Sequence, residues 1–533
     1  MTEQDQITPA AEGTGSLTRR RFIEMMGAVG GTAAAMHAMT SLGFAQGSEN
    51  RIPQLQGSGA GTSVLILGAG LAGMSSAFEL SKLGYDVRIL EFRGQAGGRC
   101  WTLRGGDTYT ELGGETQQVQ FQEGNYFNPG PWRIPYHHRT YLEYARQFGV
   151  QLEPFIQVNE NAYIHRSGPG KKYRIREVRS DFYGNVAELL SKAVNAGGLD
   201  QDLTGDDKDK MTEALAEWGA LDDAARYVKG MASSHHRGYS VDPADRLQPG
   251  EPSDLIPRSD LLQGGYWQNI IDGLVYDHQQ AIFQPVGGMD QMARAFEERT
   301  RDLITYNARV TSLTAQDTGG VSATYVDGSG AEQQVQADYC ICTIPLSVLS
   351  QVELNADPEL VRATREIAYA ASFKAGLEAR RFWETEEHIY GGVTYTDLPI
   401  AVTSYPSTGQ NLAETGVVLA AYQFGPDALK YSGMTPQQRL TEVRGMYAQI
   451  HPQMQDEFIS GVSVGWHRVP WALGCYAPYT DEQRQGAYAV LSRRHGPLML
   501  AGEHISYWNG WQEGALLSAM SAVQEIHGAA QAG

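Results

Sequence analysis

Cysteine is scarce in this chain of 533 residues, which contains four cysteines: Cys100, Cys340, Cys342 and Cys475. Their spacings match no zinc motif, and four cysteines are too few for a scaffold that depends on disulfides. Cys340 and Cys342 occupy alternate positions of an apolar segment, so we expect them to be free thiols on one face of a buried strand. The sequence therefore predicts neither a metal site nor a disulfide framework.

Positive charge is also in deficit. Lys and Arg number 42 against 61 Asp and Glu, which leaves a formal net charge of −19 and a pI near 5.1. No extended run of basic residues could line a groove for nucleic acid, so we expect no nucleic-acid partner. The length exceeds what one ordinary core accommodates, which predicts two or three domains.

Charged residues are absent from Met25 to Ser48, a stretch rich in Gly, Ala and Met. It follows the twin-arginine pattern TRRRFI at Thr18–Ile23, so residues 1–45 are predicted to be a signal for export in the folded state. A membrane anchor is the alternative, but the modest hydrophobicity favours cleavage. We expect a periplasmic or secreted protein with no stable membrane association, and a flexible linker over residues 46–61.

The stretch around which the chain is organised is Ser63–Glu91, SVLILGAGLAGMSSAFELSKLGYDVRILE. Val64–Leu67 is an unbroken apolar run, which is typical of a strand buried on both faces. Apolar residues then recur at three- and four-residue steps over Leu71–Leu83, which predicts a helix. Asp86–Leu90 reads as a second strand. The segment has the form of a β-α-β unit that binds a dinucleotide.

Four residues of this unit have distinct expected roles. Gly68 permits the tight turn after the first strand, and Gly70 lets backbone approach a pyrophosphate. Gly73 allows the helix to pack closely on the strand, and the N-terminal N–H groups of the helix are free to bind phosphate. Glu91 follows the second strand, where an acidic side chain accepts hydrogen bonds from a ribose hydroxyl. These features do not choose between NAD and FAD.

The rest of the chain alternates between layers. A mostly helical region follows the first domain, and strands at Val310, Ala323–Val326 and Tyr339–Thr343 then return to the nucleotide-binding layer. Apolar periodicity also predicts helices over Arg139–Phe148, Pro436–Ile450 and Glu513–His527, and Phe373–Phe424 has the pattern of strands. The predicted segments are residues 62–115, 284–350 and 486–530 for a nucleotide-binding domain, 116–165 and 351–485 for a substrate-binding domain, and 166–283 for an inserted helical domain.

The motif Gly97-Gly98-Arg99 comes shortly after Glu91, and this pairing resembles the flavin amine oxidase family. In that family the glycines and the arginine meet the diphosphate of FAD, and Gly502-Glu503 is similar to its second FAD segment. The resemblance implies an α/β fold with a Rossmann-like FAD-binding domain, a mixed-sheet substrate domain and an inserted helical domain. A folded-state export signal suits a protein that acquires FAD in the cytoplasm.

The motif GPWRIP at Gly130–Pro135 resembles a segment of L-amino acid oxidases in which the arginine binds the substrate carboxylate. Arg133 is the matching residue, and a planar guanidinium can hold a carboxylate by two parallel hydrogen bonds. Trp132 stands where that family has methionine, which changes the shape of the entrance. Tyr405 matches a tyrosine whose hydroxyl shares the carboxylate in the same oxidases.

Three further positions match the family's reaction site. Lys374, in Ser-Phe-Lys, resembles a lysine that holds water near flavin N5. Tyr476 and Trp511 match the two aromatic side walls, which exclude water from the amine. The implied catalytic residues are Lys374, Arg133, Tyr405, Tyr476 and Trp511. The implied cofactor-binding residues are Gly68, Gly70, Gly73, Glu91, Gly98, Arg99, Gly114, Trp132, Arg133, Val310, Gly502, Glu503, Trp511 and Gln512.

Cys475 raises a conflict between two branches of the family. It matches the cysteine that monoamine oxidases link covalently to the flavin, whereas L-amino acid oxidases generally hold FAD without that bond. We expect non-covalent FAD.

The resemblance implies oxidative deamination of L-amino acids to 2-oxo acids, with release of ammonia and hydrogen peroxide and with O₂ as second substrate. Three alternatives stay open: an amine oxidase that requires no carboxylate, an amino acid 2-monooxygenase, and a non-catalytic FAD-binding partner protein. We also expect a homo-oligomer, as a dimer. Side-chain preference does not follow from the sequence.

Overall fold

The computed structural model describes residues 52–168, 170–316 and 319–532. The predicted export signal lies outside these residues. Residues 52–61, the second half of the expected linker, lie against the C-terminal helix: His527 Nε2 is 2.9 Å from the Gln56 carbonyl oxygen, and Gln531 donates to the Ser58 carbonyl oxygen at 2.9 Å. This half of the linker is therefore held by hydrogen bonds, which corrects the expectation of flexibility. Within the described ranges no helix is both long and apolar enough to cross a membrane.

The nucleotide-binding layer is a five-stranded parallel sheet with the order β14-β2-β1-β18-β25. Its central strand β1 and its neighbour β2 are the two strands of the predicted β-α-β unit, and the other three come from distant segments. The strands are β1 (Ser63–Leu67), β2 (Asp86–Leu90), β14 (Ile304–Thr305), β18 (Tyr339–Cys342) and β25 (Leu498–Leu500).

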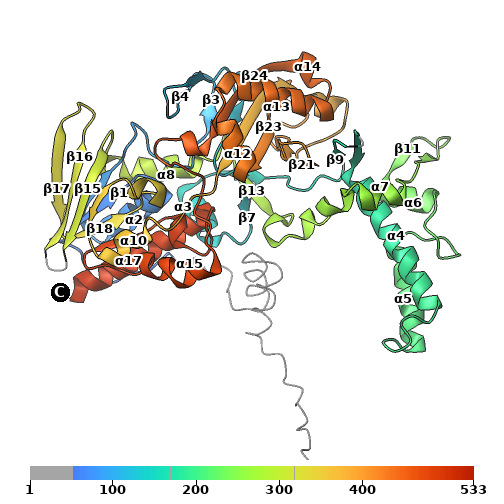
Figure 1. Ribbon diagram of the computed structural model, residues 1–533, viewed down its shortest axis with the longest axis horizontal. Helices are drawn as coiled ribbons and strands as arrows, with labels where there is room; N and C mark the ends of the chain where they lie inside the picture. The colour runs from blue at the N-terminus through green and yellow to red at the C-terminus, as the bar shows by residue number, and fades with distance from the viewer. Residues whose placement is uncertain (1–51, 169, 317–318, 533) are drawn as a thin grey trace, which may run out of the picture.

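Alternating side chains of β1 supply two different cores, as the period of a strand requires. Val64 and Ile66 pack among side chains of α2 (Leu71–Lys82), α8 (Gln291–Thr300) and α17 (Gln512–Ala532). Leu65 and Leu67 pack on the opposite face against residues of a second sheet, which lies beside β1 in Figure 1. This explains why the run has no polar alternation.

The second sheet has the order β17-β16-β15-β19. Its strands are β15 (Arg309–Gln316), β16 (Gly320–Val326), β17 (Glu332–Ala337) and β19 (Glu353–Asn355). Short helices close this side of the layer: α9 (Leu346–Leu349), α10 (Pro358–Ala363), α15 (Asp481–Gln485) and α16 (Ala487–Leu491). Cys340 and Cys342 of β18, which the sequence predicts to be free thiols, are buried in the core between β18 and this second sheet.

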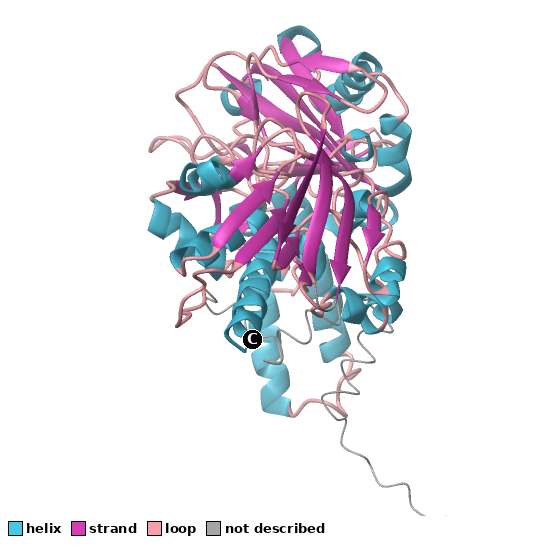
Figure 2. Cartoon of the chain, turned by 90° about the vertical axis from the view of Figure 1, so that its left-hand side faces the viewer, coloured by secondary structure: helices cyan, strands magenta, loops and turns pink. Residues whose placement is uncertain are grey.

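The substrate-side layer is a seven-stranded mixed sheet. In Figure 2 the strands of the second sheet face the viewer, and the seven-stranded sheet lies behind them. In spatial order its strands are β10 (Lys171–Arg174), β9 (Tyr163–Arg166), β21 (Val393–Thr396), β22 (Val402–Ser404), β23 (Thr415–Phe424), β20 (Ser372–Arg380) and β24 (Phe458–Gly465). Because β10 pairs with β9, the sheet continues past residue 165, where the sequence places the end of the first substrate-domain segment.

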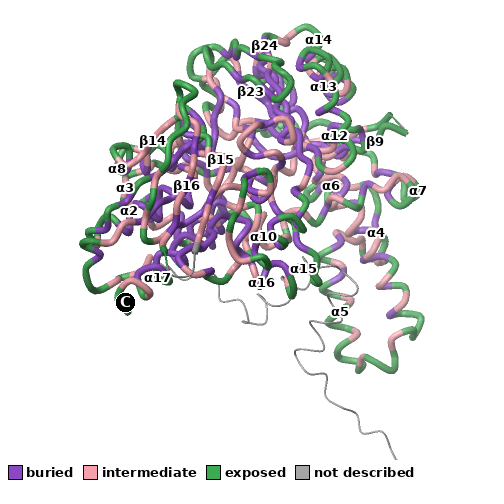
Figure 3. Tube along the Cα trace, turned by 60° about the vertical axis from the view of Figure 1, so that its left-hand side comes forward, coloured by how far each residue is buried: buried purple, intermediate pink, exposed green. Residues whose placement is uncertain are grey.

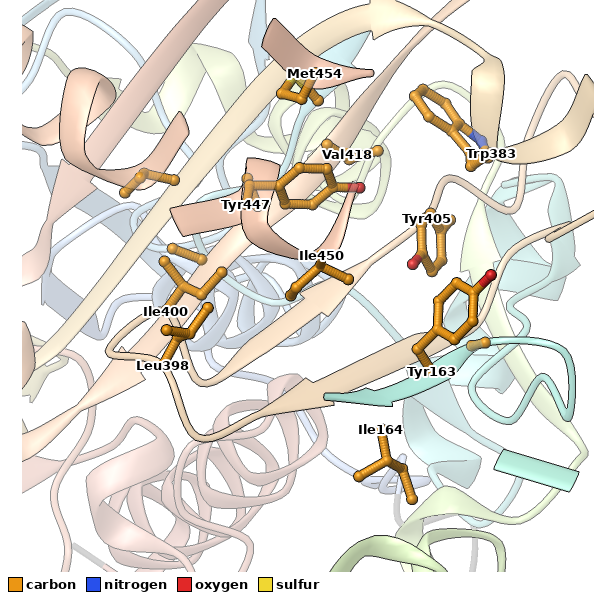
Figure 4. Packing of buried hydrophobic residues seen from close by; sticks show 14 of the residues in the cluster. Tyr163, Ile164, Trp383, Leu398, Ile400, Tyr405, Val418, Tyr447, Ile450 and Met454 are labelled. Atoms are coloured by element: carbon orange, nitrogen blue, oxygen red, sulfur yellow. The ribbon is translucent and has the colours of Figure 1, made fainter. Parts of the chain in front are cut away.

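Both faces of this sheet are covered. Helices α12 (Gly425–Ser432) and α13 (Pro436–Ile450) pack on one face, with α11 (Phe382–Thr385) and α14 (Met454–Glu457) at its margin. Figure 4 shows the resulting core, in which Val418 of β23 lies near Tyr447 and Ile450 of α13. On the other face, Val417 and Leu419 pack in a smaller aromatic cluster.

The inserted region begins with α4 (Ile175–Asn195), α5 (Gly205–Trp218), α6 (Met231–Arg237) and α7 (Arg258–Gln263). A buried ion pair between Arg237 Nε and Asp181 Oδ1, 2.7 Å apart, ties α6 to α4. Helix α5 extends away from the body and is largely exposed, as Figure 3 shows. Three 3-10 turns then bring the chain back to the body: η1 (Tyr266–Asn269), η2 (Asp272–Leu274) and η3 (Tyr276–His278).

The remaining elements connect the layers. Helix α3 (Arg139–Phe148) is the helix expected after the GPWRIP motif, and its C-cap Gly149 is left-handed at φ 73°. A three-stranded sheet joins the motif to the end of the insert: β7 (Ile134–Pro135), β13 (Ile282–Pro285) and β8 (Leu152–Pro154). Three hairpins complete the described part: β3 (Leu103–Arg104) with β6 (Tyr126–Phe127), β4 (Thr108–Thr110) with β5 (Thr116–Gln118), and β11 (Tyr239–Val241) with β12 (Glu251–Pro252).

Candidate active site

A cavity of about 940 Å³ runs between the nucleotide-binding layer and the substrate-side layer. Of the residues assigned to the site by resemblance, thirteen line it: Gly68, Gly70, Glu91, Gly98, Arg99, Trp132, Arg133, Val310, Tyr476, Gly502, Glu503, Trp511 and Gln512. Gly73, Gly114, Lys374 and Tyr405 do not line it. The structure thus brings together segments from both ends of the chain and from its middle.

One end of the cavity is the turn between β1 and α2. Gly68 has φ +101°, which a side chain disfavours, and a Cβ on Gly70 would meet no protein atom within 4 Å. A Cβ on Gly73 would lie 1.9 Å from the Gly68 carbonyl oxygen, so this glycine permits the close packing of α2 on β1. The space above Gly70 is therefore open at the start of a helix, where a diphosphate binds well.

Glu91 lies at the end of β2 and is fixed by two backbone N–H groups. Its Oε2 accepts from Ala69 N at 2.7 Å, and its Oε1 accepts from Arg93 N at 2.9 Å. Burial raises the pKa of Glu91, while the Arg93 charge and the two N–H groups oppose that rise. The carboxylate holds the glycine turn in place as well as facing the cavity.

The middle of the cavity is organised by an ion pair. Arg99 Nη1 donates to Glu503 Oε1 and to the Cys475 carbonyl oxygen, each at 2.7 Å. Glu503 Oε2 accepts from Gly510 N at 2.8 Å. The pair joins the Gly97–Arg99 motif to the Gly502-Glu503 motif across the cavity, which is the meeting of the two motifs that the resemblance implies.

The cavity also presents a polar atom that lacks a partner. Gln512, the first residue of α17, donates to Cys100 Sγ at 2.9 Å, but its Oε1 is buried and has no hydrogen bond in the described part of the chain. The open space at Gly70 and the charge of Arg99 suit the phosphates of a ligand. The unpaired Oε1 of Gln512 suits a ring that forms hydrogen bonds. FAD has both parts, so these residues fit FAD.

The other end of the cavity is aromatic and cationic. Trp132, Tyr422, Tyr476 and Trp511 line it together with Arg133. The Arg133 guanidinium lies 4.9 Å from the Trp132 ring and 5.7 Å from the Trp511 ring. Burial lowers the pKa of Arg133, and no carboxylate of the described chain lies within ion-pair distance of it. A buried guanidinium of this kind favours an anionic ligand.

Lys374 lies just behind this wall, on strand β20 between β23 and the edge strand β24. Its Nζ donates to the Gly130 carbonyl oxygen at 2.5 Å and lies 4.3 Å from the Tyr422 ring. The side chain is 1% exposed, and burial lowers the pKa of Lys374 to about 7. The predicted catalytic lysine therefore contacts residues that line the cavity and does not line it itself.

This burial predicts a pH-dependent stability that depends on Lys374. Between pH 7 and 10.5 the unfolded chain binds a proton at this lysine that the folded chain does not, so the free energy of unfolding should rise with pH across that window. Lys374→Met should remove this rise, on the order of several kcal/mol in total. Urea unfolding at a series of pH values measures it, with Lys210→Met, at an exposed position, as the control; parallel profiles for wild type and Lys374→Met would contradict it.

Tyr405 is not at the cavity, which corrects its assignment to the substrate carboxylate. It follows β22 and is 1% exposed within the core shown in Figure 4. Its hydroxyl lies 2.6 Å from His451 Nε2 and 2.8 Å from Thr394 Oγ1. These partners already satisfy the hydroxyl, so Tyr405 has a structural role in the substrate-side sheet.

The assignment of Gly114 to the cofactor-binding residues is also corrected by the structure. It is exposed in the turn between β4 and β5, with φ +88°. Tyr109 of β4 packs in the aromatic cluster on the substrate-side sheet, so the hairpin belongs to that layer and not to the cofactor end. The positive φ of a hairpin turn accounts for this glycine.

Tyr422 is a cavity residue that the sequence did not reveal. It lies within the apolar strand β23, where its position resembles that of any half-buried tyrosine. The register of the sheet pairs it with Lys374 on β20, and its ring is 5.5 Å from the Trp132 ring. Only knowledge of this cross-strand pairing could have identified it.

Cys475 lines the cavity beside Arg99. Burial raises the pKa of its thiol, which favours the protonated form. The expectation that FAD is held without a covalent bond to this residue stays a prediction.

A parallel nucleotide-binding sheet, a glycine turn at one end of a long cavity and an aromatic, cationic pocket at the other define an FAD-dependent oxidoreductase. The chain belongs to the flavin containing amine oxidoreductase family, whose profile matches residues 71–527. This confirms the resemblance found in the motifs, the fold class, and FAD as the cofactor of a flavin-dependent oxidase.

Two relatives illustrate the match. An L-amino acid oxidase from Bothriechis schlegelii is 27% identical over 483 residues, covering 88% of this chain and 90% of the relative. An L-amino-acid oxidase from Vipera ammodytes ammodytes is 28% identical over 488 residues, covering 88% and 93%. Among solved structures, putrescine oxidase bound to putrescine superposes with a TM-score of 0.57 at 14% identity, covering 88% of this chain and 99% of that chain. The last comparison supports the fold alone.

Proposed function

We propose that this enzyme oxidises L-amino acids to 2-oxo acids, with release of ammonia and hydrogen peroxide. FAD, when bound, accepts two electrons and the Cα hydrogen of the substrate and returns the electrons to O₂. The relatives named above are L-amino acid oxidases, and the cavity has the chemistry that such a substrate requires.

The observation that carries the proposal is Arg133. Its guanidinium is half-buried between Trp132 and Trp511 in the cavity, and it contacts no carboxylate of the described chain. Removing a charge from water without a counter-charge is costly, and a substrate carboxylate would compensate it. A simple amine offers no such group.

The other residues of the pocket have complementary roles. The Tyr476 and Trp511 rings enclose the substrate amine and exclude water, which favours the neutral amine. Two of the acidic residues that line the described cavity are otherwise engaged, since Glu91 binds backbone N–H groups and Glu503 binds Arg99. Asp481, the third, is exposed at the rim. An amine that arrives deprotonated requires no protein base.

The test compares substrates with and without the carboxylate. Peroxide release by the purified holoenzyme is measured across the L-amino acids, and the best substrate is then compared with its decarboxylated amine, for example L-leucine with isoamylamine. We expect a preference of roughly 10³-fold or more for the amino acid. A preference for the amine would support an amine oxidase, an amide product without peroxide would support a monooxygenase, and a flavin that no substrate bleaches anaerobically would support a non-catalytic protein.

A further inference from the structure

Arg133 is held by two neutral side chains. Its Nη1 donates to Gln157 Oε1 at 3.1 Å, and its Nη2 is 2.6 Å from His278 Nε2. Gln157 follows β8, whereas His278 ends η3 of the inserted region. One contact thus comes from a segment ahead of the inserted region and the other from the end of that region, and the two meet at the guanidinium.

One carboxylate orients both of these side chains. Asp272 Oδ1 is 2.7 Å from His278 Nδ1, and Asp272 Oδ2 accepts from Gln157 Nε2 at 3.0 Å. We refer to Gln157, Asp272 and His278 as the arginine cradle. Burial opposes ionisation of Asp272, but its contacts with His278 and Gln157 lower its pKa.

The donors and acceptors of this arrangement permit one assignment. A guanidinium only donates hydrogen bonds, so Gln157 must present its oxygen and His278 a lone pair at Nε2. The Gln157 amide N–H and the His278 Nδ1–H then face Asp272, which accepts one on each oxygen. The tautomer of His278 and the orientation of the Gln157 amide are both determined, and every contact in the ring of four residues is matched.

The cradle keeps the charge of Arg133 available. A carboxylate in direct contact with the guanidinium would neutralise it, whereas Asp272 acts through two neutral groups. Arg133 Nε is buried and has no hydrogen bond among the described residues, and each terminal nitrogen engages the cradle through one contact. A second hydrogen on each terminal nitrogen remains for a substrate.

We propose that Asp272 is a positioning residue for the oxidation reaction: through Gln157 and His278 it holds the Arg133 guanidinium in the orientation that receives the substrate carboxylate. This inference rests on the proposed function. It goes further in assigning a role to the 3-10 turns η2 and η3 of the inserted region, which supply Asp272 and His278 to the arginine cradle.

The decisive variant is Asp272→Asn. An asparagine offers one acceptor and one donor, so it cannot accept from both His278 and Gln157, and one of the two side chains must turn away or present a donor to Arg133. For the best L-amino acid substrate we expect KM to rise roughly tenfold with kcat changed less than about twofold. The Kd of benzoate, measured by perturbation of the flavin spectrum, should rise by a similar factor.

The controls separate positioning from general damage. Asp254→Asn alters an acid of the inserted region whose side chain is 92% exposed and should match wild type. His278→Gln keeps an acceptor and a donor and should stay closer to wild type, whereas His278→Leu keeps neither and should resemble Asp272→Asn. If Asp272→Asn fails to fold, the comparison of His278→Gln with His278→Leu still tests the inference. Flavin content and Tm are measured for every variant.

Several results would overturn the inference. KM and benzoate Kd equal to those of Asp254→Asn in both Asp272→Asn and His278→Leu would show that the cradle does not orient Arg133. A lower KM would show that the cradle competes with the substrate. A loss of kcat or flavin without a change in benzoate Kd would show a structural role only. Failure of the proposed function is distinct, because it appears in the wild type as a preference for amines.

Discussion

Replacing Arg133 with methionine should reduce kcat/KM for the best L-amino acid roughly 10³-fold, mainly through KM. Two charge-assisted hydrogen bonds to a carboxylate contribute about 2 kcal/mol each, which together correspond to that factor. Methionine retains much of the side-chain length and its contact with the neighbouring Trp132 ring, so the cavity should keep its shape. Oxygen consumption at a series of substrate concentrations measures the effect.

A matched arginine tests whether the effect belongs to this position. Arg362 on α10 has a side chain that is 68% exposed and pairs with Glu366 across one helical turn. Arg362→Met should leave both kinetic constants near wild type. If Arg133→Met also left KM unchanged, the carboxylate-binding role of Arg133 and the assignment to amino acid substrates would both be wrong.

Replacing Gly70 with valine should abolish flavin binding while the chain still folds. Gly70 has φ −78° and ψ −178°, an extended conformation that any residue adopts, and an added Cβ would meet no protein atom within 4 Å. The side chain would instead fill the space above the start of α2, where the FAD diphosphate is expected. We expect the Kd of FAD to rise by roughly 100-fold or more, a loss of about 3 kcal/mol or more. Flavin absorbance of the purified protein and titration of the apoprotein measure it.

Two other glycines provide control variants for Gly70→Val. A Cβ on Gly445 in α13 also meets no atom within 4 Å, so Gly445→Val should retain FAD. A Cβ on Gly73 would lie 1.9 Å from the Gly68 carbonyl oxygen, so Gly73→Ala should lower Tm by displacing α2 from β1. Normal FAD affinity in Gly70→Val would show that the cofactor does not lie against this turn.

The accuracy of the sequence predictions depended on how local each feature is. The strand Asp86–Leu90 and the helices over 139–148 and 436–450 have the bounds that the patterns predict, because hydrophobic periodicity and end signals act within a few residues. The helix predicted to start at Glu513 begins one residue earlier and runs to Ala532, and it packs against α2.

Side-chain direction was harder to predict than strand position. Tyr405 lies next to a correctly predicted strand region, but its ring enters the core beside His451 instead of the cavity. Tyr422, in the same layer, faces the cavity. Neighbouring strand residues point to opposite faces, so an offset of one residue or one strand reverses the assignment.

The sequence by itself determined that the chain has a dinucleotide-binding β-α-β unit, because this unit with its glycines and Glu91 is contiguous and its geometry follows from local backbone rules. The tertiary structure alone decided how Arg133 and Lys374 are held. Arg133 contacts His278, 145 residues away, and Lys374 donates to Gly130, 244 residues away. Such contacts are created when distant segments pack together, and hydrogen-bond matching in a water-poor interior then selects the partners, so no local pattern records them.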